Sequence, residues 1–300
     1  MTQPTVVLAG AAGDLGTRIA KALIGRGADV RALVRTDASA ADNARLTALG
    51  LTLAPADVTR VTSVAAALGG AACVVSALNG VRDVILDRQT VLLEAAVEAG
   101  VPRFISSDYS LDFTKTPPGY NRNLDLRREF MARADQVPIR VTSVLNGAFM
   151  DMLGAEMPII QPRIRRVLYW ADADQPLDFT TKDDTAAFTA AAALDDTTPR
   201  ILRIASATLS AKGLATTMSD VTGKRYHTLR GGGLGSLSTL IRVAKRVAPG
   251  TGEAFPAWQG MQYMRDMFSG YGQLEPLDND RYPDVRWTSV REQLAARFSR

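Results

Sequence analysis

Residues 5–16 read TVVLAGAAGDLG, an apolar run that passes directly into a glycine-rich stretch. The run Thr5–Ala9 is short, apolar and followed by glycine, which predicts a buried strand. Apolar residues then recur at helical spacing from Leu15 to Arg26, which predicts a helix, and Gly27 stands where a helix C-cap is expected. The chain therefore begins with a strand, a glycine turn and a helix.

Three glycines in this stretch are spaced as in a dinucleotide-binding loop. Gly10 permits a tight turn, Gly13 permits close approach of the backbone to a pyrophosphate, and Gly16 lets the helix pack against the strand. The helix start then supplies unpaired N–H groups to a phosphate. The alternative is a glycine-rich turn that binds nothing. The position between strand and helix favours a dinucleotide.

The same alternation continues as far as residue 147, with apolar runs that predict strands and amphipathic stretches that predict helices. Such alternation is typical of right-handed βαβ units and a parallel sheet. We predict strands at Val30–Val34, Leu51–Ala54, Ala72–Ala77, Arg103–Ser106 and Val141–Leu145, and helices at Val81–Ala99 and Leu124–Ala134.

After Gly147 this rhythm stops. We expect an α/β fold: a Rossmann-type doubly wound parallel sheet over residues 1–150, to which residues 178–205 return, with a smaller, mostly helical substrate lobe made of residues 151–177 and 206–300. Thr181 and Asp184 resemble a capping box for a helix through Leu194. The glycines 231–233 and 235 are predicted to form a flexible loop between helices.

Composition excludes several classes of protein. The chain has 300 residues, a net charge of +4, one cysteine and one histidine. A single cysteine, Cys73, cannot form an internal disulfide and stands in an apolar run, so we expect it to be buried. We expect no metal site, no nucleic-acid partner, no membrane span and no leader segment, hence a soluble cytoplasmic protein that binds a small-molecule substrate.

Arg35 ends the second predicted strand, where an acidic residue would select NAD by binding the ribose 2′-hydroxyl. An arginine there can instead pair with a 2′-phosphate, which favours NADP(H), although a solvated surface arginine is the alternative. Asp57 follows the third predicted strand. Its carboxylate either accepts from the adenine amino group or caps the next helix.

Several motifs resemble the NmrA-like family of atypical short-chain dehydrogenase/reductases, which includes isoflavone reductase-like enzymes and NAD(P)-binding regulators. The resemblance rests on residues 7–16 and 32–35, on residues 101–109 (VPRFISSDY), on residues 141–149 (VTSVLNGAF) and on residues 282–285 (YPDV). It implies that residues 141–149 form the sixth strand and the loop beside a nicotinamide. The whole cofactor-binding set is expected to comprise Gly10, Ala12, Gly13, Asp14, Leu15, Gly16, Arg35, Asp57, Ala77, Leu78, Ser106, Asn146 and Phe149.

The chain departs from the family at one position. Isoflavone reductase-like enzymes carry a catalytic lysine three residues before the Leu126-Arg127-Arg128 step, and this sequence has Asn123 there. The Tyr-x-x-x-Lys pair of the superfamily is also missing, because Phe113 stands four residues after Tyr109. Neither catalytic assignment transfers.

Reduction of a carbonyl group usually needs a proton donor beside the hydride donor. In the segment after the fifth strand, Tyr109 is the first candidate for this donor and Lys115 is its candidate partner. A lysine near a tyrosine favours the phenolate, so that the tyrosine can donate its proton near neutral pH. The alternative is that Tyr109 packs in the interior and Lys115 is a solvated charge. Tyr120, Asp108 and water are further candidates.

Two classes of function follow from these residues. The first is an NADPH-dependent reductase of a small, aromatic or conjugated carbonyl compound, with Tyr109 and Lys115 as catalytic residues. The second is a non-catalytic NADP(H) sensor that exchanges protein partners with the redox state of the cofactor, which the missing lysine favours. An epimerase or dehydratase is a third, weaker option.

Overall fold

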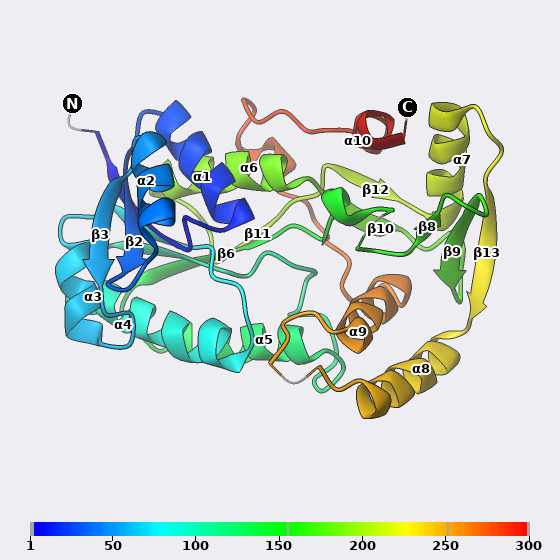
Figure 1. Cartoon of the computed structure of the whole chain (residues 1–300), viewed down its shortest axis with the longest axis horizontal. Coiled ribbons are helices and arrows are strands. Elements are labelled where there is room, and N and C mark those ends of the chain that lie inside the picture. Colours follow the sequence, from blue (N-terminus) through cyan, green and yellow to red (C-terminus); the bar gives the residue numbers. More distant parts are fainter. Residues whose placement is uncertain (1–2, 155, 251, 299–300) are drawn as a thin grey trace. The chain divides into compact units, whose positions relative to one another are not determined.

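The computed structural model describes residues 3–154, 156–250 and 252–298. By their internal contacts these residues divide into two compact units, and the chain passes between them several times. The first unit comprises residues 1–109, 126–144 and 185–202, and the second comprises residues 110–125, 145–184 and 203–300. Each unit is described separately below, with the element labels of Figure 1.

A seven-stranded sheet of order β11-β6-β5-β4-β1-β2-β3 forms the first unit. The central pairings, from β3 through β1 to β6, are all parallel. Because the order reverses between β1 and β4, the sheet has the switch point at which ligands of open α/β sheets bind. The strands are β1 (Thr5–Ala9), β2 (Asp29–Arg35), β3 (Thr52–Ala56), β4 (Cys73–Ser76), β5 (Arg103–Ser106), β6 (Arg140–Leu145) and β11 (Ile201–Arg203).

Helices flank this sheet, and a continuous apolar core lies beneath it that includes Val7, Val74, Leu93, Phe104 and Phe130. Every strand from β4 to β6 is buried almost along its whole length, as expected for parallel strands covered on both faces. The helices are α1 (Asp14–Gly25), α2 (Ala40–Ala48), α3 (Val61–Leu68), the π-helix η1 (Asp83–Arg88), α4 (Gln89–Glu98), α5 (Arg122–Ala134) and α6 (Lys182–Leu194).

The second unit contains two small sheets, of order β12-β10-β7 and β13-β9-β8. Their strands are β7 (Ala148–Phe149), β8 (Ile160–Gln161), β9 (Arg166–Trp170), β10 (Leu177–Thr180), β12 (Ala207–Leu209) and β13 (His227–Gly232). The helices are η2 (Met150–Met152), α7 (Ala211–Thr222), α8 (Leu234–Val247), α9 (Ala257–Phe268), η3 (Asn279–Arg281) and α10 (Val290–Phe298).

The structure confirms the doubly wound α/β class, and in the first sheet the late strand β11 lies beside β6. Two predicted elements differ. The helix predicted from Val81 begins as a π-helix and becomes an α-helix only at Gln89. The predicted glycine loop is also wrong in part, because Gly231 and Gly232 end strand β13.

Candidate functional site

Two of the three glycines in the first loop are required by the packing of the chain itself. Gly10 has a left-handed φ of +82°, and a Cβ there would lie 2.6 Å from the Ala77 carbonyl oxygen. A Cβ on Gly16 would lie 2.1 Å from the Gly10 carbonyl oxygen, so only glycine lets α1 come this close to the end of β1. Both positions therefore shape the loop whether or not a ligand is bound.

Gly13 has no such reason within the protein. Its φ of −73° suits any residue, and a Cβ there would meet only the Gly10 carbonyl oxygen, at 3.3 Å. Gly13 is also the N-cap of α1 and, having no side chain, supplies no capping hydrogen bond. The start of α1 thus offers backbone N–H groups next to a residue without a Cβ, which is the arrangement that binds a phosphate.

Asp14, the first residue of α1, brings a negative charge close to this loop. Its carboxylate accepts a hydrogen bond from Arg18 Nε at 2.8 Å, which offsets much of that charge. Leu15 and Ala12 contribute backbone to the same turn. The structure therefore brings together the whole glycine-loop part of the predicted set.

Arg45 was missed by the sequence reasoning. It lies on α2, and one guanidinium nitrogen donates to the Ala12 carbonyl oxygen at 2.7 Å while another donates to Thr17 Oγ1 at 3.2 Å. Arg45 therefore holds the outer side of the glycine loop. No local sequence pattern predicts this role of Arg45, because its partner Ala12 lies 33 residues earlier in the sequence.

The two arginines of β2 have different surroundings. Arg31 donates to the Gly69 carbonyl oxygen at 2.8 Å and so ties β2 to the turn after α3. Arg35 lies at the carboxyl end of β2 with its side chain 58% exposed, and its nearest acid is Asp37 at 3.5 Å. An exposed pair of this kind is weak, so the Arg35 guanidinium is available to an anion.

Asp57 does not cap the next helix. The N-cap of α3 is Arg60, whereas the Asp57 carboxylate accepts from Thr59 N at 3.0 Å and from Thr59 Oγ1 at 2.6 Å. These hydrogen bonds, with the Thr59 hydroxyl first, lower the pKa of Asp57. The carboxylate thus stays charged after β3, where a hydrogen-bond acceptor for adenine was expected.

The segment after β5 is held by a buried glutamine that the sequence reasoning also missed. Gln89 Oε1 accepts from Ser107 N at 2.9 Å, and its Nε2 donates to the Ile85 carbonyl oxygen at 3.1 Å. Ser107 Oγ donates in turn to the Leu78 carbonyl oxygen at 2.6 Å. Ser107 therefore fixes Leu78, whereas Ala77 N donates to the Ala9 carbonyl oxygen at 2.8 Å, and both residues belong to the predicted set.

Ser106 turns toward β6 instead. Its hydroxyl bonds to the Asp108 carboxyl and lies 3.2 Å from Ser143 Oγ, and Ser143 Oγ donates to Asp108 Oδ2 at 2.7 Å. Arg200 donates to Ser143 Oγ at 2.9 Å. Burial raises the pKa of Asp108, although both hydroxyl groups and the nearby arginines act against that rise.

Tyr109, the predicted proton donor, is 7% exposed and belongs to the first unit. Burial raises the pKa of its phenol, and the Thr189 hydroxyl only partly offsets this effect. The hydroxyl therefore keeps its proton at neutral pH, as a donor must. A lowered pKa, which a neighbouring lysine would produce, is not what this environment gives.

Lys115, the predicted partner of Tyr109, belongs to the second unit. Its ammonium donates to the carbonyl oxygens of Gln273 at 3.1 Å and Glu275 at 2.9 Å, and it lies 3.7 Å from the buried Asp112 carboxylate. Lys115 thus joins the loop after Ser110 to the segment after α9.

The remaining predicted residues also lie in the second unit. Asn146 is fully buried, and neither atom of its side-chain amide has a partner among the described residues. Phe149 ends β7, with the Lys182 ammonium 6.0 Å from the centre of its ring. Asn123, at the position of the family lysine, is buried and donates to the Ala254 carbonyl oxygen at 2.9 Å.

In the described ranges 3–154, 156–250 and 252–298, no cluster of three or more His, Cys, Asp or Glu side chains could hold a metal ion. Within the same ranges, no helix has the length and apolar character needed to cross a membrane.

Several solved proteins have the same fold as this chain. Similar solved structures include AtPrR2 with NADP+ and (+)-pinoresinol, at 21% identity over 99% of both chains with a TM-score of 0.83. An isoflavone reductase is 20% identical over 98% of this chain and 99% of its own, with a TM-score of 0.79. The NADPH-dependent quinone oxidoreductase QOR2 of Escherichia coli is 18% identical over 97% and 98%, with a TM-score of 0.76.

No curated protein matches the chain. The model of the NmrA-like family matches residues 2–281, which is nearly the whole sequence. The chain belongs to the NmrA-like family.

Proposed function

We propose that the protein is an NADPH-dependent reductase of a small, aromatic or conjugated carbonyl compound. The observation that carries the cofactor is Gly13, which the fold itself does not require and which stands at the uncapped start of α1. A pyrophosphate bound there would occupy the space that a Cβ would fill and would accept hydrogen bonds from the backbone N–H groups at the start of α1.

Arg35 supports NADP(H) over NAD(H). Its guanidinium has no strong partner, and β2 holds no acidic side chain after Asp29 that could bind a ribose 2′-hydroxyl. Among the described residues, Asp37 is the acid within ion-pair distance of Arg35. Structural neighbours that carry NADP+ or NADPH favour the same cofactor.

The substrate class rests on the neighbours, among which are an isoflavone reductase, a structure that holds pinoresinol and a quinone oxidoreductase. Bound NADPH supplies a hydride to the electrophilic carbon of such a compound. The protein must then deliver a proton to the carbonyl oxygen. In a conjugated compound whose outer alkene carbon takes the hydride, the proton goes instead to the alkene carbon next to the carbonyl group.

Tyr109 is our choice for the group that donates this proton. It follows the carboxyl end of β5, and its buried phenol is protonated at neutral pH.

If Tyr109 is the donor, Tyr109→Phe will lower turnover by roughly 10²–10⁴-fold at nearly unchanged affinity for NADPH. Lys115→Met will raise the apparent pKa of the same step only if the ammonium acts on the phenol. Small effects of both changes would transfer the donor role to Tyr120, Asp108 or water.

A redox sensor is the second candidate function, and Asn123 favours it. The family's catalytic lysine is replaced by an amide that is buried and bonded to the chain itself, so this position offers no titratable group. A sensor needs cofactor binding and exchange but no proton donor.

One experiment separates the two. The purified protein is titrated with NADPH and NADH, and NADPH oxidation is then followed with quinones, enones and aromatic aldehydes. A reductase binds NADPH more tightly than NADH and oxidises it with at least one compound class. Arg35→Asp should remove the preference for NADPH, while Lys21→Asp, an equal change of charge on the exposed side of α1, should not. Tight NADPH binding without turnover across the panel would favour the sensor, and tighter binding of NADH would overturn the choice of cofactor.

A further inference from the structure

Strand β13 is the edge of a three-stranded sheet in the second unit. It pairs with β9 on one side, and no described strand pairs with its other side. His227 N donates to the Arg165 carbonyl oxygen, so the alternation of a parallel ladder turns the N–H and C=O groups of Thr228 and Arg230 away from β9. An open edge of this kind can accept a further strand.

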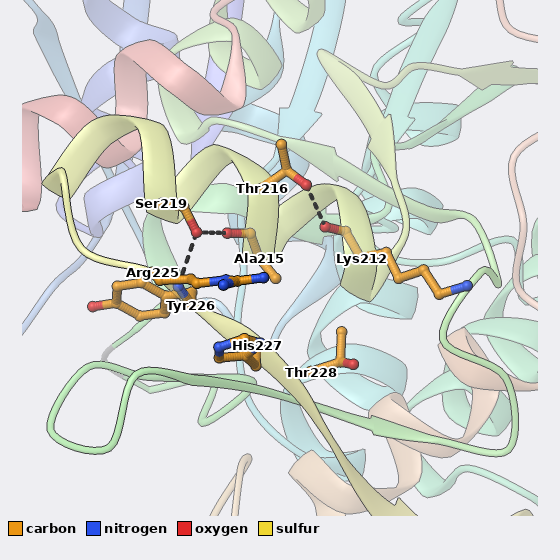
Figure 2. Close-up of a pocket in the computed structure, with 8 residues that line it drawn as sticks. All are labelled: Lys212, Ala215, Thr216, Ser219, Arg225, Tyr226, His227 and Thr228. Carbon is orange, nitrogen blue, oxygen red and sulfur yellow. Dashed lines mark hydrogen bonds between the residues drawn. The ribbon is translucent and has the colours of Figure 1, made fainter.

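A hollow of about 480 Å³ lies beside the first half of β13. Figure 2 shows α7 on one side of it and β13 on the other. From α7 come Lys212, Ala215, Thr216 and Ser219, which share one helix face, and from the strand side come residues 225–228. The hollow therefore reaches the start of β13 and includes Thr228, one of the two residues whose backbone groups face away from β9.

The hydroxyl groups in the hollow are largely occupied by the protein itself. Ser219 Oγ donates to the Ala215 carbonyl oxygen and accepts from Tyr226 N, and Thr216 Oγ1 donates to the Lys212 carbonyl oxygen (Figure 2). These contacts fix the wall on the α7 side. A ligand in the hollow would find its backbone partners on β13 instead.

Five cationic side chains surround the amino end of β13, and we call them the basic rim: Arg163, Arg165, Arg166, Lys224 and Arg225. Arg163 and Arg165 lie on the β8–β9 turn and Arg166 begins β9, whereas Lys224 and Arg225 lie on the turn that leads from α7 into β13. The sequence separates the two groups by almost sixty residues. The pairing of β13 with β9 brings them together, because His227 lies opposite Arg166.

The basic rim has no counter-charge of its own. No acidic side chain in the described ranges lies within ion-pair distance of any of the five. The acids of neighbouring segments are already paired, Asp174 with Lys212 at 2.6 Å and Asp220 with Arg291 at 2.6 Å. Ile164, at the tip of the β8–β9 turn, is 57% exposed between two rim arginines. An unpaired cationic cluster of this kind suits an anionic partner.

We infer that β13 and the basic rim form a docking site for an extended acidic segment of a partner protein, which adds to the open edge of β13 as a strand. Main-chain hydrogen bonds to Thr228 and Arg230 would give affinity, and acidic side chains against the basic rim would give selectivity. None of these residues belongs to the proposed cofactor site, so the inference stands independently of the proposed function.

The probe is a short fluorescein-labelled peptide that alternates glutamate with valine, and its binding to the full-length protein is followed by fluorescence anisotropy at low and at physiological salt. A second peptide has the same sequence with every backbone nitrogen methylated, which removes the main-chain donors of both strand edges without changing charge. We expect the first peptide to bind and the second to bind at least ~10-fold more weakly, since the methylated one has no main-chain N–H group left to donate. Equal binding of the two peptides would overturn strand addition.

The double variant Arg163→Glu/Arg225→Glu tests the basic rim. We expect it to weaken binding of the first peptide by roughly tenfold or more and to reduce the salt dependence. Arg242→Glu/Arg246→Glu, which makes the same change of charge at two exposed positions of α8, is the matched control and should bind as the unchanged protein does. An equal loss of peptide binding in the control would overturn the assignment of the basic rim, because the loss would then follow from net charge and not from the position of the arginines.

Two other polyanions complete the test. Vesicles of phosphatidylserine and a single-stranded oligonucleotide are measured with the same variants. Weaker binding of both than of the acidic peptide supports the inference. Tighter binding of either, lost in the double variant, would overturn the choice of a protein partner. Far-ultraviolet circular dichroism and thermal unfolding of every variant exclude misfolding as the cause of a loss.

Discussion

Gly13 is the residue on which the cofactor assignment can be tested most directly. Gly13→Val should leave the fold largely intact, since its Cβ meets only one backbone oxygen at 3.3 Å. It should nevertheless weaken NADP(H) binding by roughly a hundredfold or more, because the added side chain occupies the space of a phosphate. Titration of cofactor fluorescence measures the affinity.

Gly16→Ala is the contrasting control. A Cβ at that position collides with backbone, so this variant should unfold at lower temperature instead of only losing cofactor. If Gly13→Val binds NADP(H) as tightly as the unchanged protein, the loop does not hold the pyrophosphate.

The buried thiol of Cys73 is expected to make the free energy of unfolding depend on pH in the alkaline range. Burial raises the pKa of its thiol from 9.0 to about 12. Between these values the unfolded chain loses a proton that the folded chain keeps, so the free energy of unfolding falls as pH rises. The slope for one such group is about 1.4 kcal/mol per pH unit. Below pH 9 the thiol should contribute no pH dependence.

The measurement is urea unfolding at a series of pH values between 8 and 11. Cys73→Ala should be less stable throughout, because it leaves a small void, but its stability should decline less steeply above pH 9. Tyr109, whose pKa burial also raises, adds a decline that begins near pH 10 in both proteins. Parallel curves for the two proteins would contradict the prediction.

At the residue scale, the sequence could predict what depends on local spacing. The tight turn at Gly10, the close packing at Gly16 and the burial of Cys73 are confirmed, because each follows from its neighbours in the chain. Arg45 and Gln89 could not be predicted, because their roles come from partners far away in the sequence. Whether Tyr109 and Lys115 act together stays a prediction.

At the scale of elements, the change from η1 to α4 sets the position of Gln89 beside the carboxyl end of β5. The π-helix ends at Arg88, and Gln89 then points a buried amide at Ser107 N. Gln89→Leu should lower the free energy of unfolding by about 1–3 kcal/mol, because it leaves a buried N–H group without a partner. Gln136→Leu, an exposed glutamine, should change little.

Chemical denaturation of both variants measures this difference. Since Ser107 also fixes Leu78, we expect Gln89→Leu to weaken cofactor binding as well, whereas Gln136→Leu should not. Unchanged stability in Gln89→Leu would mean that water replaces the amide at no cost.

Elements were predicted well where periodicity is strong and poorly where glycine decides. Strands β1, β5 and β6 lie within one residue of their predicted bounds, and nearly every residue of these three strands is buried. The glycines at 231–233 predict a loop, yet Gly231 lies flat against Trp170, whose ring would be 2.7 Å from a Cβ. Glycine there serves a close approach between strands, a reason that composition does not reveal.

At the scale of the whole molecule, the first unit is built from three separate stretches of chain. Arg103, 7% exposed on β5, shows how closely they depend on one another. Its guanidinium donates to the carbonyl oxygens of Ala192, Ala193 and Asp195 at the end of α6. A fragment that lacks α6 leaves this buried cation without partners.

A fragment that ends at residue 150 should therefore fail to fold cooperatively, although it contains the glycine loop and most of the sheet. Thermal unfolding monitored by circular dichroism should show no sharp transition, and NADP(H) should not bind. Addition of residues 178–205 through a flexible linker is the matched control and should restore part of both. A sharp transition in the shorter fragment would contradict this prediction.

The late position of β11 also matters while the protein is being synthesised. At ~5–20 residues per second, translation takes on the order of several seconds to pass from β6 to β11. During that time the nascent chain presents β6, a buried strand of the finished protein, as a bare edge. The nascent chain thus exposes an incomplete sheet edge that can pair with another chain, and a pause or a chaperone at this stage would determine how much of the product escapes aggregation.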